Sequence, residues 1–148
     1  MKLPPAVRDA FREHGRRGGH LRAERLSPER RQAIARGAAL KRWIRERFGE
    51  PSFAKLRLPG GDLVDHGLED LASGRVTADS LLVALAQSRL RRECVPVPYV
   101  DWPDPDHHLY RLLESTDGEL AHHRYLARLR LIHSFADACA RLVGAAHA

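Results

Sequence analysis

Two residues near the C-terminus, Arg128 and His133, have types and a spacing that suit phosphate chemistry. A guanidinium group can bind a phosphate, and an imidazole can act as a general acid or base near neutral pH. The same spacing is common by chance in arginine-rich helices. The sequence contains no G-x-S-x-G nucleophile motif and no glycine-rich phosphate loop followed by G-K-[ST]. Arg128 and His133 are therefore the one candidate catalytic pair in the sequence. The alternative is that their spacing arises by chance and neither residue is catalytic.

The nine histidines raise the question of a metal site. Glu119 precedes His122 by three residues, which would place both on one helix face, but a single Glu-x-x-His is only half of a di-metal site. His122 and His133 would be roughly 16 Å apart on one helix, too far to share an ion. We expect these histidines to lie in or beside the core, with no metal and no cofactor.

The best-specified helix in the sequence runs from Ser27 to Phe48. Ser27 suits the N-cap, Pro28 the first helical position, and Glu29 the positive end of the helix dipole. When the residues are placed at about 100° each around the helix axis, apolar side chains fall along one side and basic side chains along the adjacent side. The apolar side consists of Ala33, Gly37, Leu40, Trp43, Ile44 and Phe48. The basic side, which we predict to bind nucleic acid, consists of Arg30, Arg31, Lys41, Arg42 and Arg45. The alternative is an ordinary solvated charged face.

The positive charge is concentrated at the N-terminus. Residues 1–49 hold 14 Lys/Arg and 5 Asp/Glu, a net charge of +9, whereas residues 50–148 hold 11 and 14, a net charge of −3. This asymmetry indicates a basic arm that meets an anion and an acidic body with another role. Only three of the 25 basic residues are lysines. Such a bias is typical of a GC-rich genome, and it reduces the weight of arginine abundance as evidence for phosphate binding.

Compartment and redox state follow from what the sequence lacks. It has no signal-peptide pattern and no apolar run long enough to cross a bilayer, so we expect no membrane partner. Cys94 and Cys139 are far apart and lack metal-ligand spacing, which predicts reduced, structural thiols. The expected compartment is a bacterial-type cytoplasm.

The elements before the body include a glycine break and a connector. We predict a first helix from Pro4-Pro5 to about Arg17, a break at Gly18-Gly19, and a short helical turn before Ser27. Residues 49–61 form a connector that contains one short extended segment around Phe53.

The body begins with a predicted αα-hairpin. Its first helix spans residues 62–73 and is closed by Gly74, and its second is capped by Thr77 and ends in a basic cluster. The cluster consists of Arg89, Arg91 and Arg92. A favourable interaction with the negative end of the helix dipole is the preferred explanation, and a ligand-binding patch is the alternative.

A proline-rich crossover from Cys94 to Pro105 cannot be helical. Tyr99 and Trp102 anchor it to the body or, alternatively, dock a partner. A helix then runs from Pro105 to about Glu114. Thr116 and Glu119 form a predicted capping box that starts a final helix to about Val143.

Two stretches resemble known groups of proteins. Residues 15–43 match the pattern GGxxRAxxLSxERRxxIAxxAAxxRW and resemble a short basic module of bacterial proteins of unassigned function, with Gly37 where alanine is common. Residues 60–98 are similar to the body of small proteins from bacterial toxin–antitoxin or defence loci. The resemblance implies a partner-binding or antitoxin role without a defined active site. The Arg-x4-His spacing is similar to that of HEPN-type helical ribonucleases, which dimerise. That resemblance implies that Arg128 would hold the scissile phosphate and His133 would act as acid or base, but Leu129 stands where those enzymes have a polar residue.

Together these patterns predict an all-α protein. Residues 1–49 form a basic helical arm, residues 50–61 a connector, and residues 62–148 a four-helix body with the proline-rich crossover. We expect a non-enzymatic, antitoxin-like regulator that binds DNA or RNA through the arm and a cognate protein or a second copy through the body. The alternatives are a HEPN-like ribonuclease and a pure protein–protein adaptor.

Overall fold

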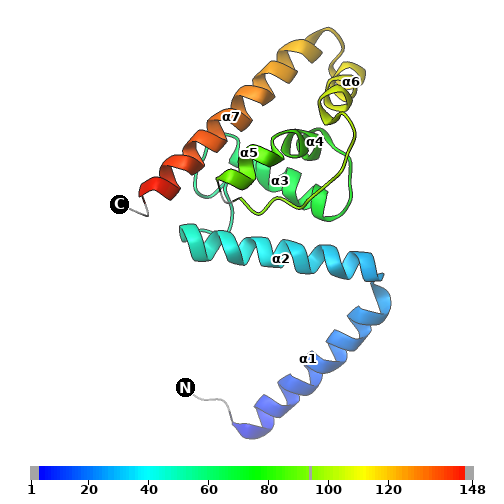
Figure 1. The fold of residues 1–148 in the computed structure, drawn as a ribbon. Coiled ribbons are helices and arrows are strands. Elements are labelled where there is room, and N and C mark those ends of the chain that lie inside the picture. The colour runs from blue at the N-terminus through cyan, green and yellow to red at the C-terminus, as the bar shows by residue number, and fades with distance from the viewer. Residues whose placement is uncertain (1–3, 94, 146–148) are drawn as a thin grey trace.

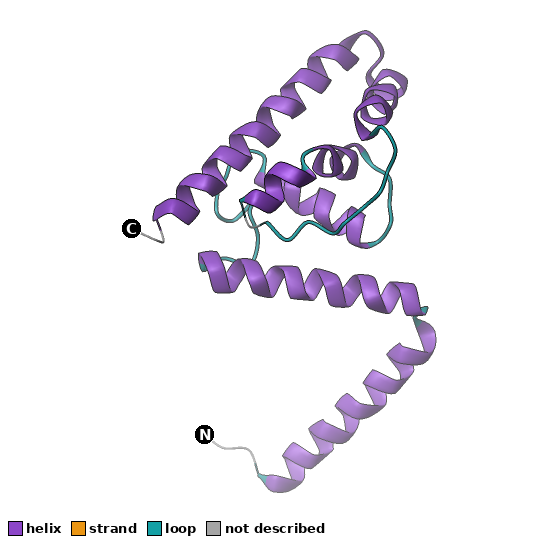
Figure 2. Cartoon of the chain, viewed as in Figure 1, coloured by secondary structure: helices purple, strands orange, loops and turns teal. Residues whose placement is uncertain are grey.

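The computed structural model describes residues 4–93 and 95–145, and the prediction of an all-α fold is confirmed. The described part contains helices and loops and no strand (Figure 2). The helices are α1 (Pro5–Arg25), α2 (Pro28–Phe48), α3 (Gly61–Ala72), α4 (Ala78–Leu85), α5 (Gln87–Arg92), α6 (Pro105–Asp117), the short 3-10 helix η1 (Gly118–Leu120) and α7 (Ala121–Ala145). In Figure 1, α3 to α7 form a body, α2 lies along one side of it, and α1 points away from it.

The core lies where α3, α4, α6 and α7 meet. Helix α4 is central because it contacts the other three, and four consecutive residues, Leu81–Ala84, are buried. From α7 the buried residues recur at helical spacing, at Ile132, Phe135, Ala136 and Cys139. Burial of such side chains is the main source of stability for a body of this size.

The α3–α4 hairpin forms as predicted. Thr77 Oγ1 accepts the N–H of Ser80 at 3.1 Å and Ser80 Oγ accepts the N–H of Thr77 at 2.8 Å, a complete capping box. Gly74 has φ +70°, the left-handed conformation expected after a helix end. Gly67 faces α4 so closely that an added Cβ would lie 2.6 Å from the Asp79 carbonyl oxygen. The two helices therefore pack backbone to backbone at this glycine.

The predicted break at Gly18-Gly19 is wrong, because α1 continues through both residues to Arg25. Glycine lowers helix propensity by about 1 kcal/mol per residue but can adopt helical φ and ψ, so a pair of glycines does not by itself end a helix. The chain turns instead at Leu26 and Ser27, where the backbone is extended before Pro28.

The predicted extended segment in the connector is also wrong. Residues 50–57 form bends and turns, and Phe53 is completely buried. The Asp65 carboxylate fixes the turn because it accepts the N–H groups of Phe53 at 3.1 Å and Ala54 at 2.9 Å. Sequence spacing did not indicate this contact, which joins the connector to α3.

Two helix boundaries in the body differ from expectation. The helix after Thr77 divides at Ala86 into α4 and α5, so the body has five α-helices in its described part rather than four. The predicted capping box of Thr116 and Glu119 does not form. Thr116 lies inside α6 and its hydroxyl donates to the Leu112 carbonyl at 3.1 Å, while η1 precedes α7.

Candidate nucleic-acid interface

Helix α2 is oriented by one apolar side. Ser27 caps it as predicted, with Oγ accepting the Arg30 N–H at 3.2 Å, and Gly49 ends it in the left-handed conformation. Ile44 is 1% exposed, and Phe48 packs between Trp43 and Phe53 at ring-centroid distances of 5.7 and 6.2 Å. Because these residues fix which side of α2 faces the body, they also fix which side faces outward.

All five basic residues predicted to bind nucleic acid are exposed on α2: Arg30, Arg31, Lys41, Arg42 and Arg45. Within residues 4–93 and 95–145, no carboxylate lies within salt-bridge distance of any of them. Sequence reasoning missed Arg36 and Arg47, which are likewise exposed and lie on the other edge of the helix. Helix α2 thus carries seven cations on a rigid support, five of them on the predicted face.

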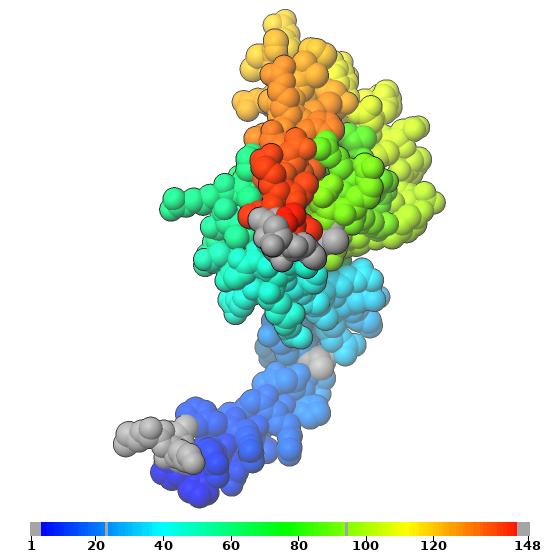
Figure 3. All heavy atoms as spheres, turned by 60° about the vertical axis from the view of Figure 1, so that its left-hand side comes forward, coloured from blue at the N-terminus to red at the C-terminus, as the bar shows by residue number. Residues whose placement is uncertain are grey.

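Helix α1 also carries exposed cations. Two of its arginines are partly neutralised within the helix, Arg12 by Asp9 at 3.7 Å and Arg17 by Glu13 at 3.3 Å. Four others are exposed and have no ion pair among the described residues: Arg8, Arg16, Arg22 and Arg25. In the space-filling view α1 stands apart from the body, so these cations meet solvent (Figure 3).

The candidate catalytic pair is not brought together around one site. Arg128 Nη1 donates to Asp79 Oδ1 at 2.5 Å, whereas His133 Nδ1 lies 2.7 Å from Arg89 Nη1. The guanidinium charge that would hold a phosphate is therefore balanced by a carboxylate, and the histidine contacts a different arginine. His122 and His133 are both exposed, so neither lies in the core; a position beside the core is the part of the expectation that the structure leaves open.

The proposed partner-docking residues differ in exposure. Trp102 is half-buried against the core, while Tyr99 is 74% exposed and carries the Arg91 guanidinium 5.4 Å from its ring centroid. Arg91 also donates to the Val97 carbonyl through Nε at 3.1 Å and Nη2 at 3.0 Å. In the basic cluster after α4, Arg89 and Arg91 thus hold tertiary contacts rather than acting only on the helix dipole.

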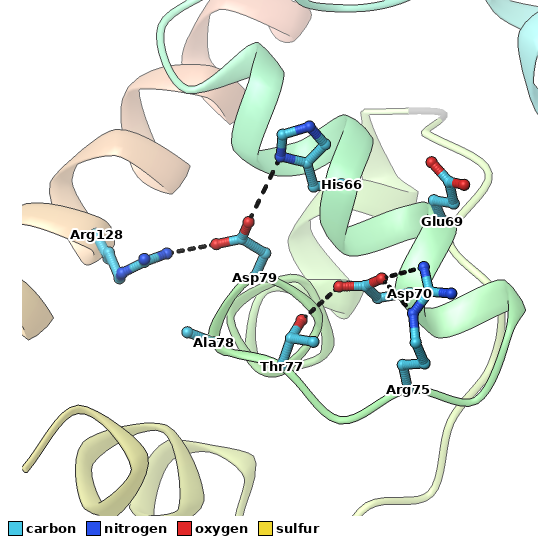
Figure 4. A pocket seen from close by; sticks show the side chains of 8 residues that line it. All are labelled: His66, Glu69, Asp70, Arg75, Thr77, Ala78, Asp79 and Arg128. Atoms are coloured by element: carbon cyan, nitrogen blue, oxygen red, sulfur yellow. Dashed lines mark hydrogen bonds and ion pairs between the residues drawn. The ribbon is translucent and has the colours of Figure 1, made fainter. Parts of the chain in front are cut away.

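A polar pocket of about 410 Å³ lies where α3, α4 and α7 meet (Figure 4). His66 and Arg128 point toward Asp79 from α3 and α7, with His66 Nδ1 at 3.8 Å. Beside them, Asp70 accepts from Arg75 Nη2 and from Thr77 Oγ1, each at 2.6 Å. Since Asp79 and Asp70 are each paired, these ion pairs and hydrogen bonds fit a role in holding the helices together better than a ligand site.

The Asp70 carboxylate should make stability depend on pH. Burial alone would raise its pKa, but the hydrogen bonds from Thr77 and Arg75 outweigh that effect and lower the pKa below its usual value. A lowered folded-state pKa stabilises the protein above the unfolded-state pKa, and this contribution is lost as the pH falls through the folded-state value.

We expect Asp70→Asn to reduce the free energy of unfolding by about 2 kcal/mol at neutral pH, with a smaller difference below about pH 4. Urea unfolding across this pH range measures both. Asp137→Asn, which removes a more exposed ion pair with Arg89, should change stability by less than about 1 kcal/mol; equal losses would contradict the assignment.

No metal site is evident where the structure describes the chain, since no group of three or more His, Cys, Asp or Glu side chains could hold an ion. Cys139 is a free, fully buried thiol, and burial, followed by the charge of Glu93, raises its pKa to about 12. A reduced structural thiol is what the sequence predicted for Cys139; Cys94 lies outside the described residues.

Comparison with known proteins adds nothing to this geometry. No family model, curated protein or solved structure matches the chain. No helix in the described ranges is both long enough and apolar enough to cross a membrane.

Proposed function

We propose that this protein is a non-enzymatic, antitoxin-like regulator that binds nucleic acid through the cationic side of α2. The observation that carries the proposal is the concentration of exposed, unpaired cations on one helix. Seven exposed cations lie within the 21 residues of α2, and none of them has a carboxylate within salt-bridge distance in the described chain. In the body, Arg75, Arg89 and Arg128 each have a carboxylate partner, and the unpaired Arg111, Arg124 and Arg130 are spread over α6 and α7. Unpaired surface cations are the groups that neutralise phosphates and release counterions.

The geometry favours binding to the phosphate backbone. Arg31 and Arg45 are separated by roughly 21 Å along the helix axis, the length of about six phosphates on one strand of a duplex. Contacts of this kind fix the position of a protein on nucleic acid without reading its sequence. We therefore propose DNA or RNA binding with little sequence preference and strong salt dependence, in the bacterial-type cytoplasm.

The test replaces Arg31, Arg42 and Arg45 together by alanine in the full-length chain. If each contacts one phosphate, affinity for a labelled DNA duplex should fall roughly a hundredfold at about 0.15 M salt. Fluorescence anisotropy gives the dissociation constants, and circular dichroism checks that α2 remains helical.

The matched control removes the same number of charges from the body. Arg111, Arg124 and Arg130 are exposed on α6 and α7 and have no ion pair among the described residues. Their triple alanine variant should bind within about threefold of the unmodified protein, because only long-range attraction is reduced. Equal losses in the two triple variants would refute binding through α2. Cleavage of RNA by the full-length protein, abolished by His133→Ala, would instead support the ribonuclease alternative.

A further inference from the structure

An apolar groove of about 550 Å³, which we call the α2 groove, lies between α2 and the body. It is lined mainly by Gly37, Leu40 and Trp43 of α2, Leu68 and Ala72 of α3, and residues 96–98 of the crossover. Arg36 is the one charged residue among the described residues that line it. An added Cβ at Gly37 would meet no atom within 4 Å, so the space beside this part of α2 is open.

The shape of this surface suits a segment of another chain. A second hollow of about 480 Å³ adjoins the α2 groove and shares Gly37, Leu40 and Ala72 with it. Small ligands are enclosed over most of their surface, whereas an extended furrow accommodates a helix or a strand.

The crossover wall of the groove cannot pair with an added strand. Pro96 and Pro98 have no backbone N–H, and the Val97 N–H already donates to the Val95 carbonyl at 2.8 Å. The Val97 carbonyl accepts two hydrogen bonds from Arg91. Residues 96–98 therefore offer a partner packing surface only, which favours a helix laid in the groove.

Charge along the groove selects an acidic partner. Arg36 lines the groove, and Arg47 lies on the same edge of α2, roughly 16 Å further along the helix axis. Both side chains are exposed, and neither has an ion pair among the described residues. A partner that covered these guanidinium groups without supplying carboxylates would leave them desolvated and unpaired, which is costly. The cationic α1 of a second copy would also meet charges of its own sign here.

The adjoining hollow does not select either sign of charge. Arg30 and Lys41 of α2 line it together with Asp65 and Glu69 of α3. Asp65 is already satisfied, since it accepts two backbone N–H groups of the connector. The preference for carboxylates therefore comes from the edge of α2 that carries Arg36 and Arg47.

We propose that the α2 groove binds an acidic amphipathic helix of a partner protein. Apolar side chains of that helix lie beside Leu40 and Trp43, and a carboxylate on each flank pairs with Arg36 and Arg47. On a helix, carboxylates at positions 1 and 12 and leucines at positions 5 and 8 fall on one face, and the two carboxylates are separated by the same roughly 16 Å. The recognition pattern is thus Glu-x3-Leu-x2-Leu-x3-Glu, with Asp equivalent to Glu.

This site is separate from the nucleic-acid surface proposed above. Arg31, Arg42 and Arg45 lie on the other edge of α2, well over 90° around the helix axis from Arg36 and Arg47. Both ligands can therefore bind the same helix, and each can be removed without the other.

The probe is a labelled peptide that carries this pattern in an alanine-rich helical background. Fluorescence anisotropy with the full-length protein at about 0.15 M salt should show saturable binding, and the fluorescence of Trp43 should change because its indole lines the groove. A matched peptide with lysine in place of both glutamates should bind at least about tenfold more weakly.

Three variants locate the binding. Arg36→Glu combined with Arg47→Glu should reverse the preference, so that the lysine peptide binds better than the glutamate peptide. Gly37→Leu fills the groove and should abolish binding of both peptides, while circular dichroism checks that α2 remains helical. Arg31→Glu combined with Arg42→Glu is the matched control: it makes the same change in charge on the other edge and should retain the glutamate peptide while losing affinity for duplex DNA.

Several results would overturn the proposal. They are no binding of the glutamate peptide up to about 1 mM, equal affinity for the two peptides, and binding that Gly37→Leu leaves unchanged. Binding of duplex DNA that requires Arg36 and Arg47 and displaces the peptide would assign this edge to nucleic acid instead. A dimer of the unmodified protein that Gly37→Leu makes monomeric would assign the groove to a second copy. Peptide binding is measured without nucleic acid, so its failure is distinct from a failure of phosphate binding by α2.

Discussion

Phe53→Ala is expected to lower the free energy of unfolding by about 4 kcal/mol, the largest effect of any single substitution considered for this chain. Phe53 is fully buried and packs edge-to-face on Phe135 of α7 with ring centroids 5.0 Å apart. Its other face meets Phe48, the last residue of α2. Truncating this ring leaves a cavity at the junction of the connector, the body and α2, and the surrounding rings can only partly close it.

Urea unfolding followed by tryptophan fluorescence measures this loss, because Trp43 lies in the same aromatic chain. Phe11→Ala provides the matched control, since Phe11 is 65% exposed on α1. It should change the free energy of unfolding by less than about 0.5 kcal/mol. A small effect of Phe53→Ala would mean that the connector does not pack into the core as described.

Gly67→Ala is expected to destabilise the body by about 3 kcal/mol, although alanine is the better helix former. The new methyl group would lie 2.6 Å from both the Asp79 carbonyl oxygen and Val83 Cγ2. The first of these atoms is backbone and cannot rotate away, so α3 and α4 must separate. That movement would also disturb the central core residues of α4.

Thermal or chemical unfolding of Gly67→Ala should be compared with that of Gly37→Ala. Gly37 also lies inside a helix, but a Cβ there meets nothing within 4 Å. Helix propensity alone then acts, and Gly37→Ala should stabilise the chain by up to about 1 kcal/mol. If both variants were stabilised, the close approach of α3 and α4 would be contradicted.

Local signals in the sequence predicted the fold class and several helix ends. Helix caps are contacts between residues only three to six positions apart, so the sequence itself indicates them. The examples are the N-caps Ser27 and Thr77, and Gly74 after the end of α3. The predicted helix break at Gly18-Gly19 is wrong because a glycine pair weakens a helix without ending it. The exposure of the five predicted cations on α2 also follows from local periodicity.

Contacts between distant segments could not be predicted in the same way. Asp65 binding the turn at Phe53, and Arg89 reaching Asp137, each join residues more than ten positions apart. Spacing along the sequence fits either His66 or Gly67 on the packed face of α3. Only the approach of α4 decides that Gly67 is buried and His66 exposed.

Phosphate binding by α2 is best tested through its dependence on salt. Anisotropy titrations of a labelled duplex and of single-stranded RNA, at several salt concentrations, give the slope of log K against log salt for the full-length protein and the Arg31, Arg42 and Arg45 triple variant. We expect a steep negative slope for the unmodified protein, made shallower by about 2.7 on duplex DNA when three phosphate contacts are lost. No binding by the unmodified protein, or the same slope for both proteins, would contradict it.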